Sequence, residues 1–221
     1  MARARTGPTP PRESPPDLPE RLDSHTAMAA RDDLSGVSID AMSGDVSLAH
    51  GRLIDGLVEG ASLGRWDLTG ATLTDVRIAD LRATEVITRD GAWRSVEIIG
   101  GRIATLDASR AAWDGVRLEG LRIDYLSLAA ADVGDLVLVG CDIGTLDVPQ
   151  ARLVRVAFED CRVDEVDTRG LRGEHLDLRG LEALRFTDAR GLTGATLSVR
   201  QAELHGPAFA AALGIRLAPG S

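Results

Sequence analysis

Two cysteines and four histidines are the residues of this chain best suited to metal binding or redox chemistry. Cys141 and Cys161 lie twenty positions apart, and no CxxC or HxxxH spacing occurs. The histidines are far apart along the chain, at His25, His50, His175 and His205. Because a zinc site needs several such ligands brought together at short spacings, the sequence predicts no structural or catalytic metal site.

The chain also lacks the features that usually support enzymatic catalysis. No lysine occurs anywhere, so a phosphate-binding loop has no lysine to offer, and no GxGxxG motif is present. Serine and histidine residues are available, but the sequence pattern places none beside another. We therefore expect a protein that is not an enzyme, with no catalytic residue, no cofactor and no bound metal.

Composition narrows the choice of partners and compartment. The chain has 221 residues and a formal net charge of −9, which disfavours direct binding to nucleic acid or to an anionic membrane. Only two cysteines are present, as is usual in a reducing compartment. The basic N-terminal residues are not followed by an apolar stretch, and no apolar run approaches a membrane span. A cytoplasmic protein is predicted.

A five-residue period dominates the sequence from residue 61 onward. Every fifth residue from 61 to 186 is apolar or glycine, at all 26 positions. Two places after these, the residue is apolar in 22 of 25 cases, the exceptions being Thr88, Thr168 and Gly173. This period drifts by about 140° per repeat around a helix, and an odd period changes the face of a continuous strand at each repeat. The pattern therefore predicts very short extended sides separated by corners.

Four such sides return the chain above its starting point after twenty residues. Residues twenty positions apart are then stacked about 4.8 Å apart, as in a parallel ladder. Roughly seven coils are expected from Val46 onward, in a solenoid about 34 Å long. Inward positions include all three tryptophans and both cysteines, and we expect the cysteines to be reduced core residues although their spacing permits a disulfide.

The repeat is similar to that of the pentapeptide repeat family. Residues 61–78, ASLGRWDLTGATLTDVRI, come closest to the family pattern A-(D/N)-L-x-x, and residues 191–215 resemble the closing segment of many bacterial members. The resemblance covers residues 46–215 and implies an all-β fold, a right-handed quadrilateral β-helix. It implies no catalytic residues. Some members resemble B-DNA in shape and charge and act on type II topoisomerases. The chain departs from the pattern at the first inward site, where Leu, Val or Trp replaces the usual small residue in most coils.

Three regions are expected along the chain. Residues 1–30, with six of the nine prolines, predict a disordered extension without a role of its own. Residues 31–197 form the solenoid. Residues 198–221 form a helical cap, because Ser198 and Gln201 have capping-box spacing and PAFAAALG predicts a short helix from Pro207 to Gly214. This helix would cover the last coil or mediate a homodimer.

Charged residues are predicted to stack in columns on the solenoid surface. Asp107, Ser127, Asp147 and Asp167 share one outward column, and Arg82, Arg102, Arg122 and Arg162 share another, interrupted by Asp142. Between Arg122 and Arg152 the chain has no cation, so the middle coils are acidic. The candidate interaction surface comprises Asp107, Tyr125, Asp147 and Asp167, with Asp124, Asp132, Asp135 and Asp142. Tyr125 is the only aromatic residue expected at an exposed corner.

Two functions are compatible with such a surface. The first is a protein-binding or scaffolding solenoid whose partner the sequence does not identify. The alternative is an acidic DNA mimic that binds a type II topoisomerase such as gyrase. Residues 61–190 contain 23 acidic residues against 17 arginines, so the arginine column dilutes the negative field and favours the first function.

Overall fold

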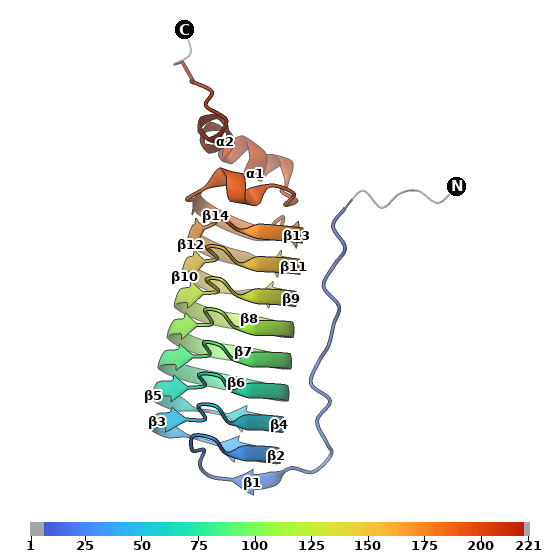
Figure 1. The fold of residues 1–221 in the computed structure, drawn as a ribbon, viewed down its shortest axis with the longest axis vertical. Helices are drawn as coiled ribbons and strands as arrows, with labels where there is room; N and C mark the ends of the chain where they lie inside the picture. Colours follow the sequence, from blue (N-terminus) through green and yellow to red (C-terminus); the bar gives the residue numbers. More distant parts are fainter. Residues whose placement is uncertain (1–6, 219–221) are drawn as a thin grey trace, which may run out of the picture.

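The computed structural model describes residues 7–218, which form one long β-solenoid with a helical cap at its C-terminal end (Figure 1). The strands are β1 (Asp23–His25), β2 (Asp33–Asp40), β3 (Ser43–Ser47), β4 (Arg52–Glu59), β5 (Ser62–Asp67), β6 (Thr72–Ile87), β7 (Ala92–Asp107), β8 (Ala112–Ser127), β9 (Asp132–Val139), β10 (Asp142–Asp147), β11 (Arg152–Glu159), β12 (Cys161–Asp167), β13 (Arg172–Asp177) and β14 (Leu181–Phe186). The helices are η1 (Ala189–Leu192), α1 (Val199–Leu204) and α2 (Gly206–Ala212).

All strand pairs are parallel, and from β4 onward each residue pairs with the residue twenty positions later. The predicted twenty-residue coil is therefore confirmed. The chain leaves the ordinary extended conformation at corners of positive φ, for example at Asp75, Asp80 and Asp90. These corners recur every coil, which gives the solenoid its short straight sides.

The core is a narrow column filled by the two inward positions of each side. Of the positions identified from the period, all are buried except Gly101 and Gly173. Gly101 has φ +117°, and a Cβ there would lie 2.0 Å from the carbonyl oxygen of Leu81, so only glycine fits. The two polar exceptions are satisfied locally. Thr88 Oγ1 donates to Asp107 O, and Thr168 Oγ1 donates to Asp188 O.

The solenoid begins one coil earlier than the sequence period suggested. The structure has about eight turns, and β2 forms a first coil whose residues pair nineteen rather than twenty positions later. Between Met42, which is buried, and Val46, which is partly buried, one residue is missing from the five-residue period. The ladder of β3 and β5 shifts register between Gly44 and Val46. This missing residue hides the first coil from a pattern search.

Residues 7–30 differ from the disordered tail that their proline content predicted. β1 pairs with β2, and the preceding residues run back along one edge of the solenoid as far as the coil of β13 (Figure 1). Four hydrogen bonds join this segment to solenoid side chains. We call residues 8–19 the strap. The expectation of disorder for residues 1–6 lies outside the described residues.

The C-terminal region closes the solenoid as predicted. Ser198 and Gln201 form the capping box of α1, and Gln201 Nε2 also donates to the carbonyl oxygens of Leu178 and Leu181 in the last coil. His205 is buried and packs edge-on against Phe186, with ring centroids 4.9 Å apart. The cap thus covers both the backbone edge and the apolar end of the solenoid. No helix within residues 7–218 is long and apolar enough to cross a membrane.

We expect Leu126→Asp to destabilise the protein severely. Leu126 is fully buried and pairs in the ladder with Leu106 and Leu146, so a carboxylate there would have no polar partner. Loss of more than about 4 kcal/mol in the free energy of unfolding, measured by urea denaturation, is the expected result. Thr84→Asp at an exposed position is the control. Equal unfolding midpoints for the two variants would mean that the inward register is wrong.

Candidate interaction surface

The ladder places the acidic column as the sequence predicted. Asp107 pairs with Ser127, Ser127 with Asp147, and Asp147 with Asp167, so β7, β8, β10 and β12 each contribute one member. We keep the name acidic column for these four residues. The arginine column is also confirmed, because Arg122 and Arg162 flank Asp142 in the same ladder.

Most members of the acidic column hold the turn that follows them. In each case a side-chain oxygen accepts a hydrogen bond from the backbone N–H two residues later, the geometry of an Asx or Ser turn. Within the column this contact joins Asp107 to Ser109, Ser127 to Ala129 and Asp167 to Arg169. Outside the column the same contact joins Asp67 to Thr69 and Asp177 to Arg179. The column therefore has a structural cause that is independent of any partner.

Asp107 and Asp167 are also neutralised by arginine. Arg89 Nε lies 3.3 Å from Asp107, and the Arg169 guanidinium forms a bidentate contact with Asp167. The hydrogen bond from Arg169 lowers the pKa of Asp167 to about 2, and bonds from the Arg169 N–H and Thr187 Oγ1 add to this effect. Neither carboxylate is available as a free negative charge.

Asp147 is different because its second following residue is Pro149, which has no N–H to donate. Its carboxylate instead accepts a hydrogen bond from the Tyr125 hydroxyl of the neighbouring coil. Tyr125 lies at a corner, 36% exposed, and pairs in the ladder with Thr105 and Thr145. Desolvation, and then the bond to Asp147, raise the pKa of Tyr125 to about 12. The hydroxyl proton is thus held between the two side chains at neutral pH.

The remaining candidate residues are spread over the solenoid rather than gathered into one site. Asp124 pairs with Arg102, and Asp132 pairs with Arg152. Asp142 is exposed in the arginine column. Asp135 is buried beneath the strap and receives two hydrogen bonds from Arg155. Asp135 lies ten residues, or two sides of a coil, from Tyr125, so the two occupy opposite corners.

The sequence contains one pattern that resembles a catalytic motif. Residues 60–64, GASLG, have the GxSxG letters of a nucleophile elbow. Ser62 nevertheless lies on β5, within the parallel ladder, rather than on a turn between a strand and a helix. Its hydroxyl has no hydrogen bond to a described histidine, and none of the described residues cluster as metal ligands. The pattern is a product of the repeat.

The two cysteines are free and buried, as expected for core residues. The Cys141 N–H donates to Cys161 Sγ at 3.4 Å, and each thiol contacts a backbone carbonyl oxygen. The hydrogen bond between the two side chains and burial raise the pKa of the Cys141 thiol. The tryptophans are also buried, with Trp93 stacked on Trp113 at a centroid distance of 4.9 Å.

These observations decide the architecture. The chain is a parallel β-solenoid built on a five-residue repeat. Its sides are five residues long, its coils are twenty residues long, and its inward residues stack in parallel register. Sequence reasoning named Asp135 as a surface residue, but it predicted neither the strap nor the contact between the strap and Asp135.

Comparison with solved structures finds chains of similar fold. Three chains of QnrB1, a plasmid-mediated fluoroquinolone resistance protein, are similar to the solenoid. A trypsin-treated form is 19% identical with a TM-score of 0.43, over 89% of this chain and 100% of that one. The full-length form is 12% identical with a TM-score of 0.31, over 85% of this chain and 99% of that one. No family model and no curated protein matches the chain.

Asp107 forms a turn contact and Asp147 does not, so we expect their truncation to alanine to lower the free energy of unfolding by different amounts. Asp107→Ala removes a turn acceptor and an ion pair, and we expect it to lower the free energy of unfolding by about 1 kcal/mol. Asp147→Ala removes no turn contact and should cost less than about 0.5 kcal/mol. Urea unfolding of both variants measures the difference. Equal losses would contradict the assignment of Asp147 as the member without a turn role.

Asp167→Asn is expected to have a pH-dependent effect. The variant keeps an oxygen for the turn but loses the charge paired with Arg169. Because the folded pKa is about 2 and the ordinary value 3.8, the ionised form stabilises the fold above the ordinary value. Arg169 is 72% exposed, so the deficit of the variant should be at most about 1 kcal/mol at pH 7. It should shrink as pH falls from about 4 to about 2, measured by urea unfolding at each pH. A constant deficit would contradict the charge contribution.

Proposed function

We propose that this protein is a non-enzymatic, bacterial binding module of the cytoplasm, which uses Tyr125 and Asp147 to contact a cationic side chain of a protein partner. The observation that supports this proposal is the release of Asp147 from turn formation by Pro149. A carboxylate retained in the column without its usual structural role is the member best explained by contact with another molecule.

The local chemistry fits an arginine of the partner. Asp147 uses Oδ2 for Tyr125, and its Oδ1 accepts no hydrogen bond from the residues between 7 and 218. A guanidinium can donate to that oxygen while its plane lies against the exposed tyrosine ring. Tyrosine and arginine are enriched among the residues that dominate protein interfaces. Thr105 and Thr145, which pair with Tyr125 in the ladder, add no charge at this corner in the two adjacent coils.

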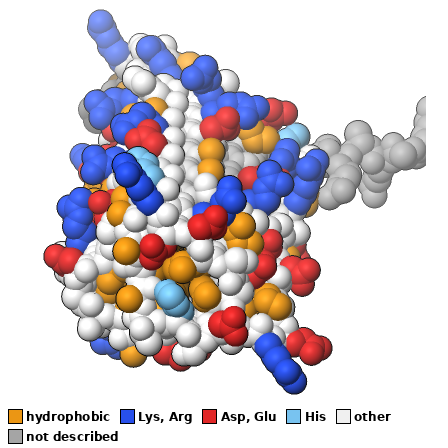
Figure 2. Space-filling model, turned by 60° about the horizontal axis from the view of Figure 1, so that its bottom comes forward, with side chains coloured by type: hydrophobic (Ala, Val, Ile, Leu, Met, Phe, Trp, Pro, Cys, Tyr) orange, Lys and Arg blue, Asp and Glu red, His pale blue; other side chains and the backbone are white. Residues whose placement is uncertain are grey.

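Mimicry of DNA is the second candidate, and the exposed acids Asp124 and Asp142, with the half-buried Asp147, favour it. Such a role needs a nearly continuous negative face, because the partner groove is lined with cations. Arg102, Arg122 and Arg162 lie in the column beside these acids. On the face seen in Figure 2, basic and acidic side chains are mixed, without a large area of one sign. The arrangement supports the first function better.

A homodimer through the cap is part of the proposal. Large apolar side chains are exposed near the C-terminal end of the solenoid, namely Leu184, Val199, Leu204, Leu213, Ile215 and Leu217. Exposed apolar groups of this extent are typical of surfaces that associate. Sedimentation velocity over a hundredfold range of concentration tests the dimer, and a single monomeric species throughout would contradict it.

The test of the binding surface compares two charge changes in one column. Immobilised wild type, Asp147→Asn and Asp107→Asn are used to recover partners from a lysate of the source organism. Both variants lose one negative charge, but only Asp147 is proposed to contact the partner. We expect at least a tenfold loss of the recovered partner with Asp147→Asn and little change with Asp107→Asn, quantified by mass spectrometry.

Purified gyrase separates the two candidate functions in the same experiment. Under the first function the protein leaves DNA supercoiling unchanged. Inhibition near the enzyme concentration that weakens as salt rises would support mimicry instead, because charge contacts are screened. Equal recovery of the partner by wild type and Asp147→Asn would contradict the role of the Tyr125 corner.

A further inference from the structure

The strap lies along one corner of the solenoid. We call Asp75, Ser95, Gly115, Asp135, Arg155 and His175 the strap column. The strap runs along it in the direction opposite to coil growth (Figure 1). Thr9 N donates to His175 Nδ1, Arg12 N to Asp135 Oδ1 and Asp17 N to Asp75 Oδ1, while the hydroxyls of Ser14 and Ser95 are 2.6 Å apart. All four contacts use strap residues other than proline.

The spacing of these contacts matches a polyproline II helix. From Thr9 to Asp17 the strap advances eight residues while the column advances five coils, from His175 to Asp75. Five coils span about 24 Å, so the strap rises about 3.0 Å per residue, close to the 3.1 Å of polyproline II. One turn of that helix, three residues, spans about 9.3 Å, or nearly two coils. Thr9 and Arg12 show this register, contacting His175 and Asp135 two coils apart.

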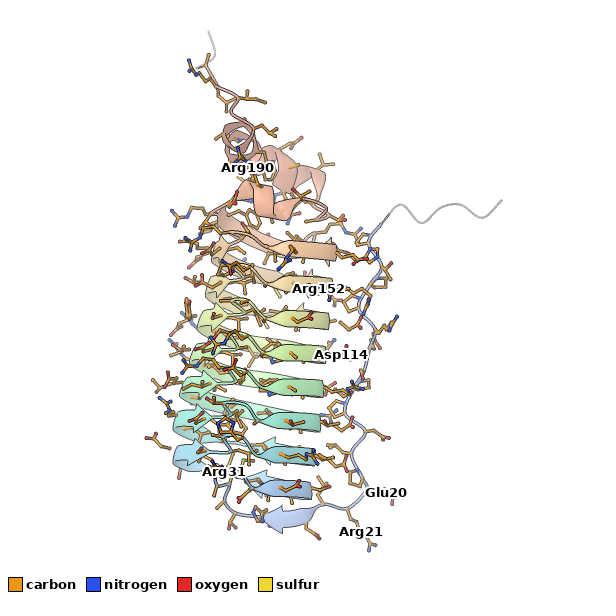
Figure 3. All side chains as sticks on the ribbon, viewed as in Figure 1. Glu20, Arg21, Arg31, Asp114, Arg152 and Arg190 are labelled. Carbon is orange, nitrogen blue, oxygen red and sulfur yellow. The ribbon has the colours of Figure 1, made fainter. Side chains whose placement is uncertain are left out.

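The groove beneath the strap is built of polar groups that are buried although they point outward. Ser95, Glu97 and Asp135 all belong to outward positions, yet Asp135 is only 5% exposed. Burial alone would raise the pKa of Asp135, but bonds from Arg155 and from the Arg12 N–H keep it below its ordinary value. A cleft of about 270 Å³ separates the strap from β7, β8 and β9. Figure 3 shows strap side chains along this edge, with Glu20 and Arg21 near the lower end.

Gly115 marks the closest approach of the strap. It has φ +67°, and a Cβ at this position would lie 2.8 Å from Ser14 Cβ. Neighbouring members of the strap column adopt the same positive φ with side chains present, for example Ser95 and Asp135. The positive φ alone therefore does not require glycine at position 115. The proximity of Ser14 in the strap does require it.

We propose that the strap column is a recognition groove for proline-rich, extended segments, and that residues 8–19 are a ligand held within the same chain. A proline-rich segment of another protein enters the groove by displacing the strap. This site lies at the corner opposite Tyr125, so it goes beyond the binding surface proposed above. Its ligand is defined by a polyproline II conformation and by backbone N–H groups that meet Asp75 and Asp135.

The attachment of the strap allows such an exchange. Between Pro8 and Pro19 the strap makes one buried charge-assisted contact, at Asp135, and most of its residues are exposed. Polyproline II has no internal hydrogen bonds to break or reform, and its stiffness lowers the entropy lost on binding. A ligand in solution competes with a tethered strap whose effective concentration is in the millimolar range.

The experiment measures binding of a labelled peptide to full-length proteins by fluorescence anisotropy. The peptide has the sequence of residues 7–21 with Ser14→Gly, so that, unlike the strap, it has no Cβ to meet an alanine at position 115. Gly115→Ala should push the strap away, and Gly120→Ala is its control, with φ +62° and open space around an added Cβ. We expect Gly115→Ala to bind the peptide at least tenfold more tightly than wild type, and Gly120→Ala to bind as wild type does. In Ser14→Cys/Ser95→Cys, oxidation with glutathione disulfide should lock the strap and abolish binding, and reduction should restore it.

Peptide variants test the proposed recognition directly. N-methylation at Arg12 removes the N–H that meets Asp135, whereas N-methylation at Glu13 removes an N–H that bonds to none of the described residues. The first should weaken binding to Gly115→Ala about tenfold relative to the second. Amide hydrogen exchange of the wild type should show protection at Arg12 relative to Glu13.

Three results would overturn the proposal. Equal exchange of the Arg12 and Glu13 amides would show that the groove does not hold even its own strap. Equal peptide affinity for Gly115→Ala, Gly120→Ala and the oxidised double-cysteine variant would place binding elsewhere. A Gly115→Ala variant that self-associates more strongly than the wild type in sedimentation, without binding the peptide, would show that the occupant is the strap of a second copy.

Discussion

The width of the core is the constraint on which the whole structure depends. Each five-residue side has room for two inward side chains, and the parallel ladder places each of them on its counterpart one coil away. The sizes of the inward side chains must therefore be complementary between successive coils of one stack and also between the stacks of one coil. Trp93 lies on Trp113, and the neighbouring inward positions in the same coils are Gly91 and Ala111. The same constraint leaves three indole N–H groups buried without a partner among the described residues.

The core and the cap could be predicted because their determinants are local and repeated. Two positions in every five specify the inward face, and Ser198 with Gln201 specify the start of α1. The predicted solenoid, residues 31–197, includes the first coil, but the five-residue period does not extend to that coil, because one residue is missing between Met42 and Val46. The coil still forms because the register of a parallel pair depends on which carbonyl meets which N–H, and a bulge absorbs the difference.

The surface was less predictable, since one residue type serves two purposes in the same column. Aspartate at this position usually accepts the N–H two residues later, so Asp107 and Asp167 reflect turn chemistry. The exception at Asp147 can be predicted from the sequence, because Pro149 has no N–H to donate and the turn contact cannot form there. The strap could not be predicted from the sequence. Three of its four hydrogen bonds join backbone donors to side chains more than fifty positions away, and the fourth joins two serine hydroxyls. Proline content alone predicts only an extended chain.

Ion pairs between adjacent coils limit where recognition can occur. Arginine and a carboxylate meet twenty residues apart at Arg65–Glu85, Arg77–Glu97, Arg110–Asp90, Arg152–Asp132 and Arg155–Asp135. Each exposed pair contributes little to stability, but it cancels the charge that a partner would read. Because stacking places equal positions directly over one another, a purely acidic column would repel itself at each step of about 4.8 Å. Arginines placed between the acidic residues relieve that repulsion. They also cancel the negative electrostatic potential that a partner could sense at long range. Under the proposals above, specific contacts lie outside the pairs, at the Tyr125 corner, or in a groove where a second segment supplies the missing donors, as the strap does at Asp135.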